Sequence, residues 1–106
     1  MQGKQPIKSK RFAFVSKDNY VVDLEYSSEF AILHLPYVKK FSKSTYLDML
    51  DEIKGIVSFL NDLNYEYVWL AIKPEDILIA KFVKKLGFSY KGTSDNLDVY
   101  LYEGTN

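Results

Sequence analysis

The pattern of apolar and polar positions is clearest over residues 73–88, which read KPEDILIAKFVKKLGF. The apolar residues of this stretch recur at the spacing of one helical face, at Ile79, Phe82, Val83 and Leu86. Pro74 suits the first helical position, because its missing N–H would be unpaired there in any case. Gly87 suits the helix end, where a left-handed conformation is common. The pattern predicts a helix that fills this stretch, between a strand at 67–72 and another from Phe88.

Shorter runs of alternating or β-branched residues predict six strands around this helix. They lie at 12–15, 20–26, 30–38, 67–72, 88–91 and 97–102. Short turns separate the first three, which predicts an antiparallel meander. The order of elements indicates an α+β fold, β-β-β-α-β-α-β-β, in which two main helices pack on a mixed sheet.

The first of these helices is predicted from Thr45 to about Leu63. Thr45 and Asp48 form a candidate capping box at its start, with aspartate in place of the usual glutamate. Gly55 lies in the middle of the pattern, where glycine costs about 1 kcal/mol relative to alanine. Its presence suggests that the helix packs closely on the sheet.

Composition restricts the chemistry. The 106 residues predict a single domain over 12–106, preceded by a basic tail at 1–11. The chain has no cysteine and one histidine, which excludes thiolate and multi-histidine metal sites. Its formal net charge is zero, so the protein as a whole is not expected to attract nucleic acid. It contains neither an apolar run of roughly 20 residues nor a signal peptide, so we expect a soluble, non-secreted protein without a membrane partner.

Residues 80–88, AKFVKKLGF, resemble the last helix of the GNAT superfamily of N-acetyltransferases, which runs into a Leu-Gly-Phe ending. The order of elements from about Phe12 to Glu103 is similar to the GNAT core, with its first strand and the two helices that follow either absent or reduced to the N-terminal tail. The chain resembles most closely the reduced GNAT-like proteins that tailed bacteriophages encode. This resemblance implies a GNAT-like fold and a location in the cytoplasm of a host cell or in a virion.

GNAT enzymes hold acetyl-CoA between two splayed parallel strands, with its pyrophosphate on the N-terminus of the next helix. The resemblance places these strands at 30–38 and 67–72 and the phosphate loop at 38–45, which has no glycine. Side chains there replace the bare backbone that would approach a pyrophosphate. The side chains that remain for anion binding are Lys39, Lys40, Ser42, Lys43, Ser44 and Thr45. We therefore expect no cofactor, with acetyl-CoA as the ligand if the protein is an enzyme.

The catalytic positions of the family are also altered. Val83 occupies the place of the tyrosine that often serves as general acid, and it has no proton to donate. Asp76 occupies the place of an asparagine and is explained by the preference for negative charge at a helix N-terminus. His34 lies in the strand where many GNAT enzymes carry a glutamate base, and its imidazole titrates near neutrality. His34 is therefore the candidate catalytic residue, and the alternative is a partly buried polar residue without a catalytic role.

Two functions remain open. The favoured hypothesis is a phage-borne, non-catalytic GNAT-like module that binds a phage or host protein or forms part of a virion. The alternative is an acyl-CoA-dependent N-acetyltransferase with an unusual, glycine-free cofactor loop. An open gap between the two splayed strands would favour the enzyme, whereas Trp69 or Phe41 filling that gap would exclude it.

Two surfaces are candidates for a macromolecular partner. Tyr100 and Tyr102 are expected to point away from the buried face of their strand, and exposed tyrosines favour protein interfaces. Basic groups at 4–11, 39–43 and 81–85 leave a nucleic-acid-binding face as a third alternative.

Overall fold

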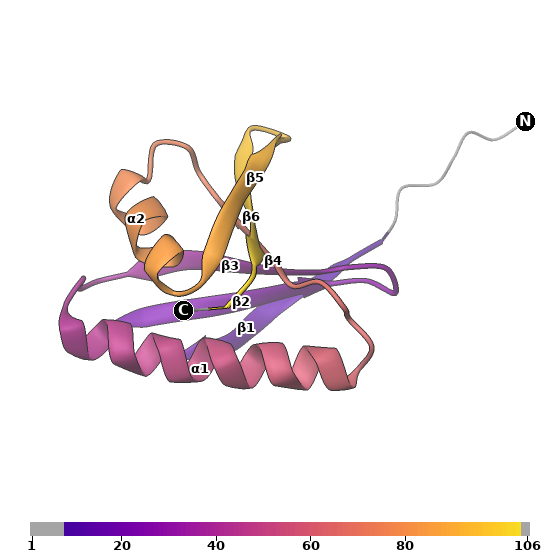
Figure 1. Ribbon diagram of the computed structural model, residues 1–106, viewed down its shortest axis with the longest axis horizontal. Helices are drawn as coiled ribbons and strands as arrows, with labels where there is room; N and C mark the ends of the chain where they lie inside the picture. Colours follow the sequence, from indigo (N-terminus) through magenta and orange to yellow (C-terminus); the bar gives the residue numbers. More distant parts are fainter. Residues whose placement is uncertain (1–7, 105–106) are drawn as a thin grey trace, which may run out of the picture.

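The computed structural model describes residues 8–104 (Figure 1). Its elements confirm the predicted order and the α+β class. They are β1 (Lys10–Ser16), β2 (Tyr20–Tyr26), β3 (Ala31–Val38), α1 (Lys43–Asp62), β4 (Trp69–Ile72), α2 (Ile77–Lys85), β5 (Phe88–Ser94) and β6 (Leu97–Tyr102). No helix in this part of the chain is long and apolar enough to cross a membrane.

The six strands form one mixed sheet in the order β1-β2-β3-β4-β6-β5. The first three strands are antiparallel neighbours, which confirms the predicted meander. Of the strand pairs described, β3 and β4 alone are parallel, and they pair over three residues each, up to His34 and Ala71. β3 continues to Val38, so the middle of the sheet opens beyond these two residues.

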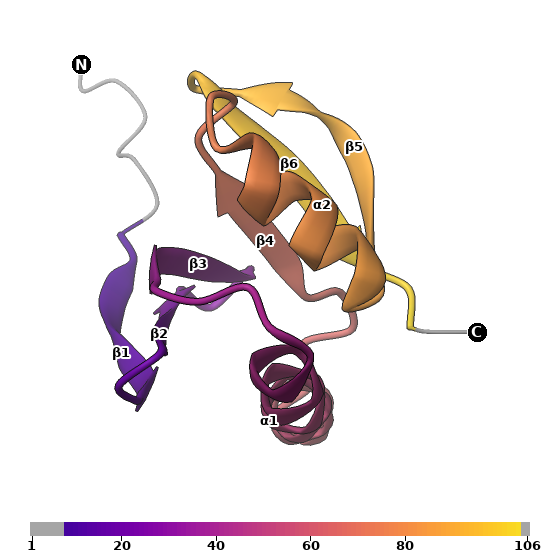
Figure 2. The same ribbon diagram turned by 90° about the vertical axis from the view of Figure 1, so that its left-hand side faces the viewer.

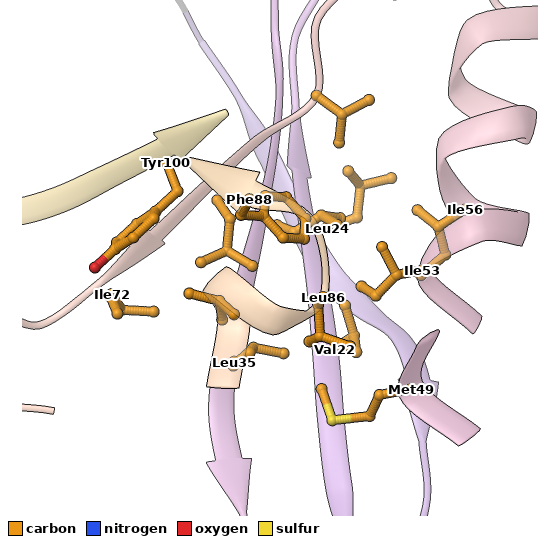
Figure 3. Close-up of a cluster of buried hydrophobic side chains, with 14 of the residues drawn as sticks. Val22, Leu24, Leu35, Met49, Ile53, Ile56, Ile72, Leu86, Phe88 and Tyr100 are labelled. Carbon is orange, nitrogen blue, oxygen red and sulfur yellow. The ribbon is translucent and has the colours of Figure 1, made fainter. Parts of the chain in front are cut away.

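The hydrophobic core lies on one face of the sheet, because residues in register across the strands point the same way. One such row is Leu24, Leu33, Leu70 and Tyr100. All four residues are buried and belong to one cluster with Ile53 of α1 and Val83 of α2. Figure 3 shows part of this cluster, with Met49, Ile53 and Ile56 of α1 beside Val22 and Leu24. Both helices therefore cover the same face.

The opposite face carries no helix within residues 8–104 (Figure 2). Its registered rows combine polar side chains on β1 and β2 with apolar ones toward β4 and β6. One row runs Arg11, Glu25, Ile32, Trp69 and Leu101, and the next runs Ala13, Asp23, His34, Ala71 and Val99. Candidate base His34 therefore lies on the helix-free face.

The start of α2 differs from the prediction. Residues 73–76 form a turn in which the N–H of Asp76 donates to the carbonyl of Lys73 at 3.0 Å, and the helix begins at Ile77. Proline is favoured at the second position of such a turn, so Pro74 serves the turn instead of the first helical position. The helix end is as predicted, because Gly87 follows the cap residue Leu86 with a φ of +105°.

The start of α1 also differs from the prediction. Ser42 caps the helix by accepting a hydrogen bond from the backbone N–H of Thr45 at 3.2 Å, so Thr45 is not the cap. Asp48 binds Lys17 and Tyr20 instead of closing a capping box. Gly55 was expected to mark close packing, but a Cβ at this position would meet no atom within 4 Å. That interpretation was wrong.

The ends of the chain refine two further boundaries. Lys10 and Arg11, which were assigned to the basic tail, form the start of β1, while residues 1–7 lie outside the described part. β5 continues through the predicted turn to Ser94, with a bulge between Tyr90 and Gly92. The hairpin turn consists of Asp95 and Asn96, both with positive φ, as a two-residue turn of this kind requires.

Candidate functional site

The opening between β3 and β4 forms a cavity of about 330 Å³. Its lining residues come from both strands, the turn before α2, β1 and the start of β6, namely Arg11, His34, Leu35, Pro36, Ala71, Ile72, Lys73, Asp76 and Leu97. Asp76 is the residue before the first turn of α2, and its side chain makes no capping hydrogen bond. The cavity therefore combines one imidazole with side chains of both charges.

His34 and Glu25 form a close pair at this cavity. His34 Nε2 lies 2.9 Å from Glu25 Oε1, and the two residues are diagonal neighbours on adjacent antiparallel strands. The other carboxylate oxygen, Glu25 Oε2, accepts a hydrogen bond from Ser9 Oγ at 2.6 Å. Beside this pair, Arg11 Nε lies 3.0 Å from Asp23 Oδ2. The carboxylate of Glu25 favours the tautomer in which Nε2 carries the proton and Nδ1 carries the lone pair.

The charge state of His34 follows from its burial. The side chain is 11% exposed, and burial lowers the pKa of His34 below its ordinary value, opposed by the hydrogen bond to Glu25. Arg11 lowers this pKa further. Hydrogen bonds from Ser9 and His34 lower the pKa of Glu25. At neutral pH the pair is a neutral imidazole beside a carboxylate, with the lone pair of the ring on Nδ1.

A larger groove of about 630 Å³ lies on the other side of the sheet, between the first turns of α1 and the length of α2. We call it the α1–α2 groove, and its lining residues are Phe41, Ser42, Lys43, Tyr46, Leu47, Leu78, Lys81, Phe82 and Lys85. The ring of Phe41 meets the ring of Phe82 edge-on, with 5.3 Å between centroids. Tyr46 Oη donates to the carbonyl of Lys85 at 3.0 Å and joins the two helices.

The structure separates the six candidate cofactor residues. Ser42 and Lys43 line the α1–α2 groove, whereas Lys39 and Lys40 are exposed and do not. Ser44 lines a small hollow beside Lys17 and Asp48, and Thr45 is 2% exposed. The oxygen of Ser42 already accepts from the N–H of Thr45, so this backbone donor is not available to a phosphate. The predicted set does not form one site.

The cavity beside His34 and the α1–α2 groove share no lining residue. Leu35 and Ile72 line the cavity beside His34, and both are almost fully buried in the core, at 6% and 4% exposure. In Figure 3 they lie in the same cluster as Leu86 and Tyr100. The cavity and the α1–α2 groove therefore both border the same core, the cavity through Leu35 and Ile72 and the groove through Phe82.

Neither Trp69 nor Phe41, either of which would have excluded the enzyme by filling the gap, lines the cavity. Trp69 pairs with Ile32 and Leu101 in the closed part of the sheet. Phe41 lines the α1–α2 groove instead. The core residues that line the cavity are aliphatic, Leu35 and Ile72, and the sequence analysis did not single them out.

The orientation predicted for the two tyrosines of β6 was wrong. Tyr100 is 3% exposed and belongs to the core, and Tyr102 packs against Phe88 with 5.3 Å between ring centroids. Leu97, Val99 and Leu101 are the residues that alternate onto the helix-free face. The proposed role of Tyr100 and Tyr102 in partner binding therefore loses its structural basis.

Glu25 is the site residue that sequence reasoning missed. Glu25 lies two residues after Asp23 in β2, so both side chains are on the same face of the strand. This spacing is visible in the sequence. Its pairing with His34 depends on the register of β2 and β3, which shifts by a bulge between Val21 and Asp23. Among residues 8–104, no group of three or more histidine or acidic side chains is placed to hold a metal ion.

Comparison with protein-family models, with curated proteins and with solved structures finds no match to this chain.

Proposed function

We propose that the protein is a GNAT-like binding module that does not catalyse acyl transfer. In this proposal it is phage-borne and has a phage or host protein as its partner, or a place in the virion. The sequence resemblance to reduced phage GNAT-like proteins supports this origin. The chain resembles the core of a GNAT enzyme, but it lacks the glycine-containing phosphate loop and the tyrosine acid of that family.

The topology supports the GNAT-like part of the proposal. The family core has two central parallel strands that splay apart, and β3 and β4 are parallel neighbours whose pairing ends at His34 and Ala71. The helix after β4 ends at Gly87, where the Leu-Gly-Phe motif places the helix end. The face that the missing strand and helices would cover is the helix-free face of this sheet within residues 8–104 (Figure 2).

The separation of the two hollows carries the non-catalytic part of the proposal. A pantetheine arm must pass between the splayed strands to bring an acyl group from the α1–α2 groove to His34. Leu35 and Ile72 line the cavity and belong to the core, and we propose that they close this path. Val83 is fully buried, so no side chain at this position reaches a leaving thiolate. Opening the path would remove two aliphatic side chains from the core, at a cost of about 2 kcal/mol or more for each.

Calorimetric titration with acetyl-CoA and with CoA tests the proposal. We expect no saturable heat at millimolar ligand, because the glycine-free loop offers side chains in place of backbone donors. Saturable binding at micromolar ligand would contradict the proposal. In that case, Lys43→Gln compared with Lys40→Gln would show whether the ligand lies in the α1–α2 groove, since Lys43 lines the groove and Lys40 does not.

The Glu25–His34 pair favours acyl-CoA-dependent N-acetyltransferase activity as a second candidate function. A neutral imidazole held by a carboxylate is suited to accept the proton of an attacking amine, and Nδ1 is the atom available for it. The amine nitrogen would form a bond to the thioester carbonyl, and the thiolate would leave. This function requires Leu35 and Ile72 to move apart when the cofactor binds.

Thiol release from acetyl-CoA in the presence of primary amines tests the second candidate. If the protein is an acetyltransferase, release exceeds the uncatalysed rate and falls in His34→Gln, while the folded state is unchanged by circular dichroism. Release at the uncatalysed rate with every amine excludes this candidate.

A further inference from the structure

The α1–α2 groove has the chemistry of a docking site for a polypeptide. We infer that it holds an acidic, amphipathic segment of a protein partner. This inference rests on the proposed binding function and specifies the partner that such a function requires. Three observations support it. The lining residues of each helix fall on one helical face, the groove contains exposed apolar side chains, and the lysines around them form no salt bridge within residues 8–104.

Each helix contributes one wall to the groove. Lys43, Tyr46 and Leu47 of α1 follow the spacing i, i+3, i+4 and so lie on one face of that helix. On α2 the lining residues follow i, i+3, i+4 and i+7, which also defines one face, with Leu78, Lys81, Phe82 and Lys85. The hydrogen bond from Tyr46 to the carbonyl of Lys85 holds the two walls together.

The floor of the groove is aromatic and its margin is aliphatic. Phe82 is 8% exposed and contacts both Phe41 and Tyr46 edge-on. Phe41 is 42% exposed, Leu47 48% and Leu78 63%. These large apolar side chains remain in water on the free protein, and exposed apolar patches of this kind mark interaction sites. A partner with apolar side chains of its own would remove them from water.

The charge of the groove has one sign. Three lysines line it, Lys43, Lys81 and Lys85, and no acidic side chain lines it. Within residues 8–104, none of the three forms a salt bridge. The first turn of α1 also contains no acid that would offset the positive end of that helix. Charge complementarity therefore selects an acidic partner.

The shape favours a polypeptide segment over a membrane or a nucleic acid. Phe82 is recessed between two helices, where a flat lipid surface does not reach, and an amphipathic segment inserts its apolar side chains into such a groove. A volume of about 630 Å³ lies within the usual range of ligand sites and accommodates a few side chains of a segment. The phosphates of a duplex nucleic acid would contact the three lysines and leave the apolar floor exposed to water.

Selection from random peptides displayed on yeast tests the inference. We expect wild-type protein to enrich peptides that combine Asp or Glu with large apolar residues. The enriched peptides are then synthesised with a fluorescent label, and their binding is measured by anisotropy. A selection that enriches neutral or basic peptides, or no peptide above the unselected library, would overturn the inference.

Charge variants locate the binding. Lys81→Glu with Lys85→Glu reverses two charges of the groove, and we expect affinity for the enriched peptides to fall by about tenfold or more. Lys54→Glu of α1 with Lys84→Glu of α2 makes the same change in net charge at two lysines that do not line the groove, and serves as the control. Leu78→Ser removes an exposed apolar contact without a change in charge. Equal binding by all of these variants would overturn the assignment to the groove.

Two further probes separate this inference from the proposed function. Acetyl-CoA that binds and displaces the peptide would show that the non-catalytic function is wrong. If neither acetyl-CoA nor any peptide binds, the groove inference fails and the non-catalytic function stands. Vesicles of phosphatidylcholine with phosphatidylglycerol test a membrane as the partner. If no peptide is enriched, and the protein binds these vesicles but loses this binding in Lys81→Glu with Lys85→Glu, the inference of a protein partner is wrong and the groove binds a membrane surface.

Discussion

At the scale of single residues, Asp48 connects two parts of the fold that are distant in sequence. It accepts hydrogen bonds from Tyr20 Oη at 2.6 Å and from Lys17 Nζ at 2.8 Å. The hydrogen bond from Lys17 lowers the pKa of Asp48, and the bond from Tyr20 adds to this effect. Burial raises the pKa of Tyr20, so its hydroxyl remains a donor at physiological pH.

Tyr20→Phe is expected to destabilise the protein by about 1 kcal/mol. The ring stays in the core, where Tyr20 is 1% exposed, but the hydrogen bond to Asp48 is lost. The value lies below the range of about 1.5–3 kcal/mol for a hydrogen bond to a charged group, because the side chain of Asp48 is 48% exposed. Urea denaturation of Tyr20→Phe, Asp48→Asn and the double variant gives the coupling energy. Additive effects would show that the bond contributes nothing.

Gly87→Ala is expected to destabilise the protein by at least about 2 kcal/mol. Gly87 has a φ of +105°, and an added Cβ would lie 2.9 Å from the carbonyl carbon of Gly104. The backbone N–H groups of Glu103 and Gly104 both donate to the carbonyl of Gly87, so the C-terminal segment is held close to this glycine. The midpoint of thermal unfolding reports the loss.

Gly55→Ala is the control for Gly87→Ala, because it makes the same substitution where the added Cβ meets no other atom. A Cβ at position 55 meets no atom within 4 Å, and the residue lies inside α1. The substitution should therefore stabilise the protein by about 0.5–1 kcal/mol. Destabilisation by both substitutions would contradict the distinction drawn between the two glycines.

At the scale of elements, β2 and β3 create the ionisable pair of the candidate site. Register places Asp23 opposite His34, and Glu25 lies diagonally from His34 on the same face. Burial in the sheet lowers the pKa of His34, while the carboxylate of Glu25 raises it. The net effect is a lowered pKa, because burial outweighs the carboxylate.

Glu25→Gln is expected to lower the pKa of His34 further, because the substitution removes the carboxylate that stabilises the imidazolium. An NMR titration of the single histidine measures this pKa directly. Arg11→Gln is the opposite control, since Arg11 lowers the pKa of His34 and its removal should raise it. An unchanged pKa in both variants would show that the pair does not persist in solution.

The same pair predicts how stability depends on pH. The pKa of His34 is lower in the folded state than the ordinary 6.5, so the unfolded chain takes up the proton first and stability falls as pH drops below about 6.5. The pKa of Glu25 is also lowered, so a second loss follows below its ordinary value of 4.5. Denaturation midpoints near pH 7 and pH 5 should differ in wild type, and the difference should shrink in His34→Gln.

Periodicity predicted the order and type of the elements, whereas turns and caps decided their ends. Pro74 was compatible with a helix start and with a turn, and only the hydrogen bond from Asp76 to Lys73 distinguishes the two. β6 was assigned the wrong buried face. Both of its faces are rich in large apolar or aromatic residues, so alternation alone does not say which one the helices cover.

At the scale of the whole molecule, the sheet has one face covered by two helices and one face without a helix in the described part of the chain (Figure 2). His34 was predicted as a site residue because the family resemblance places a glutamate base in its strand. The pairing of His34 with Glu25 and the burial of Leu35 and Ile72 depend on strand register and core packing between distant segments, which local patterns do not encode.

The central claim is that core side chains separate the α1–α2 groove from the cavity at His34. Amide NMR spectra recorded with increasing acetyl-CoA test this claim most directly, because they report on both hollows at once. We predict no saturable shift at His34, Leu35 or Ile72, whatever happens at Lys43 and Lys81. Saturable shifts at both hollows with one shared dissociation constant would show that a ligand passes through the sheet, and would contradict the claim.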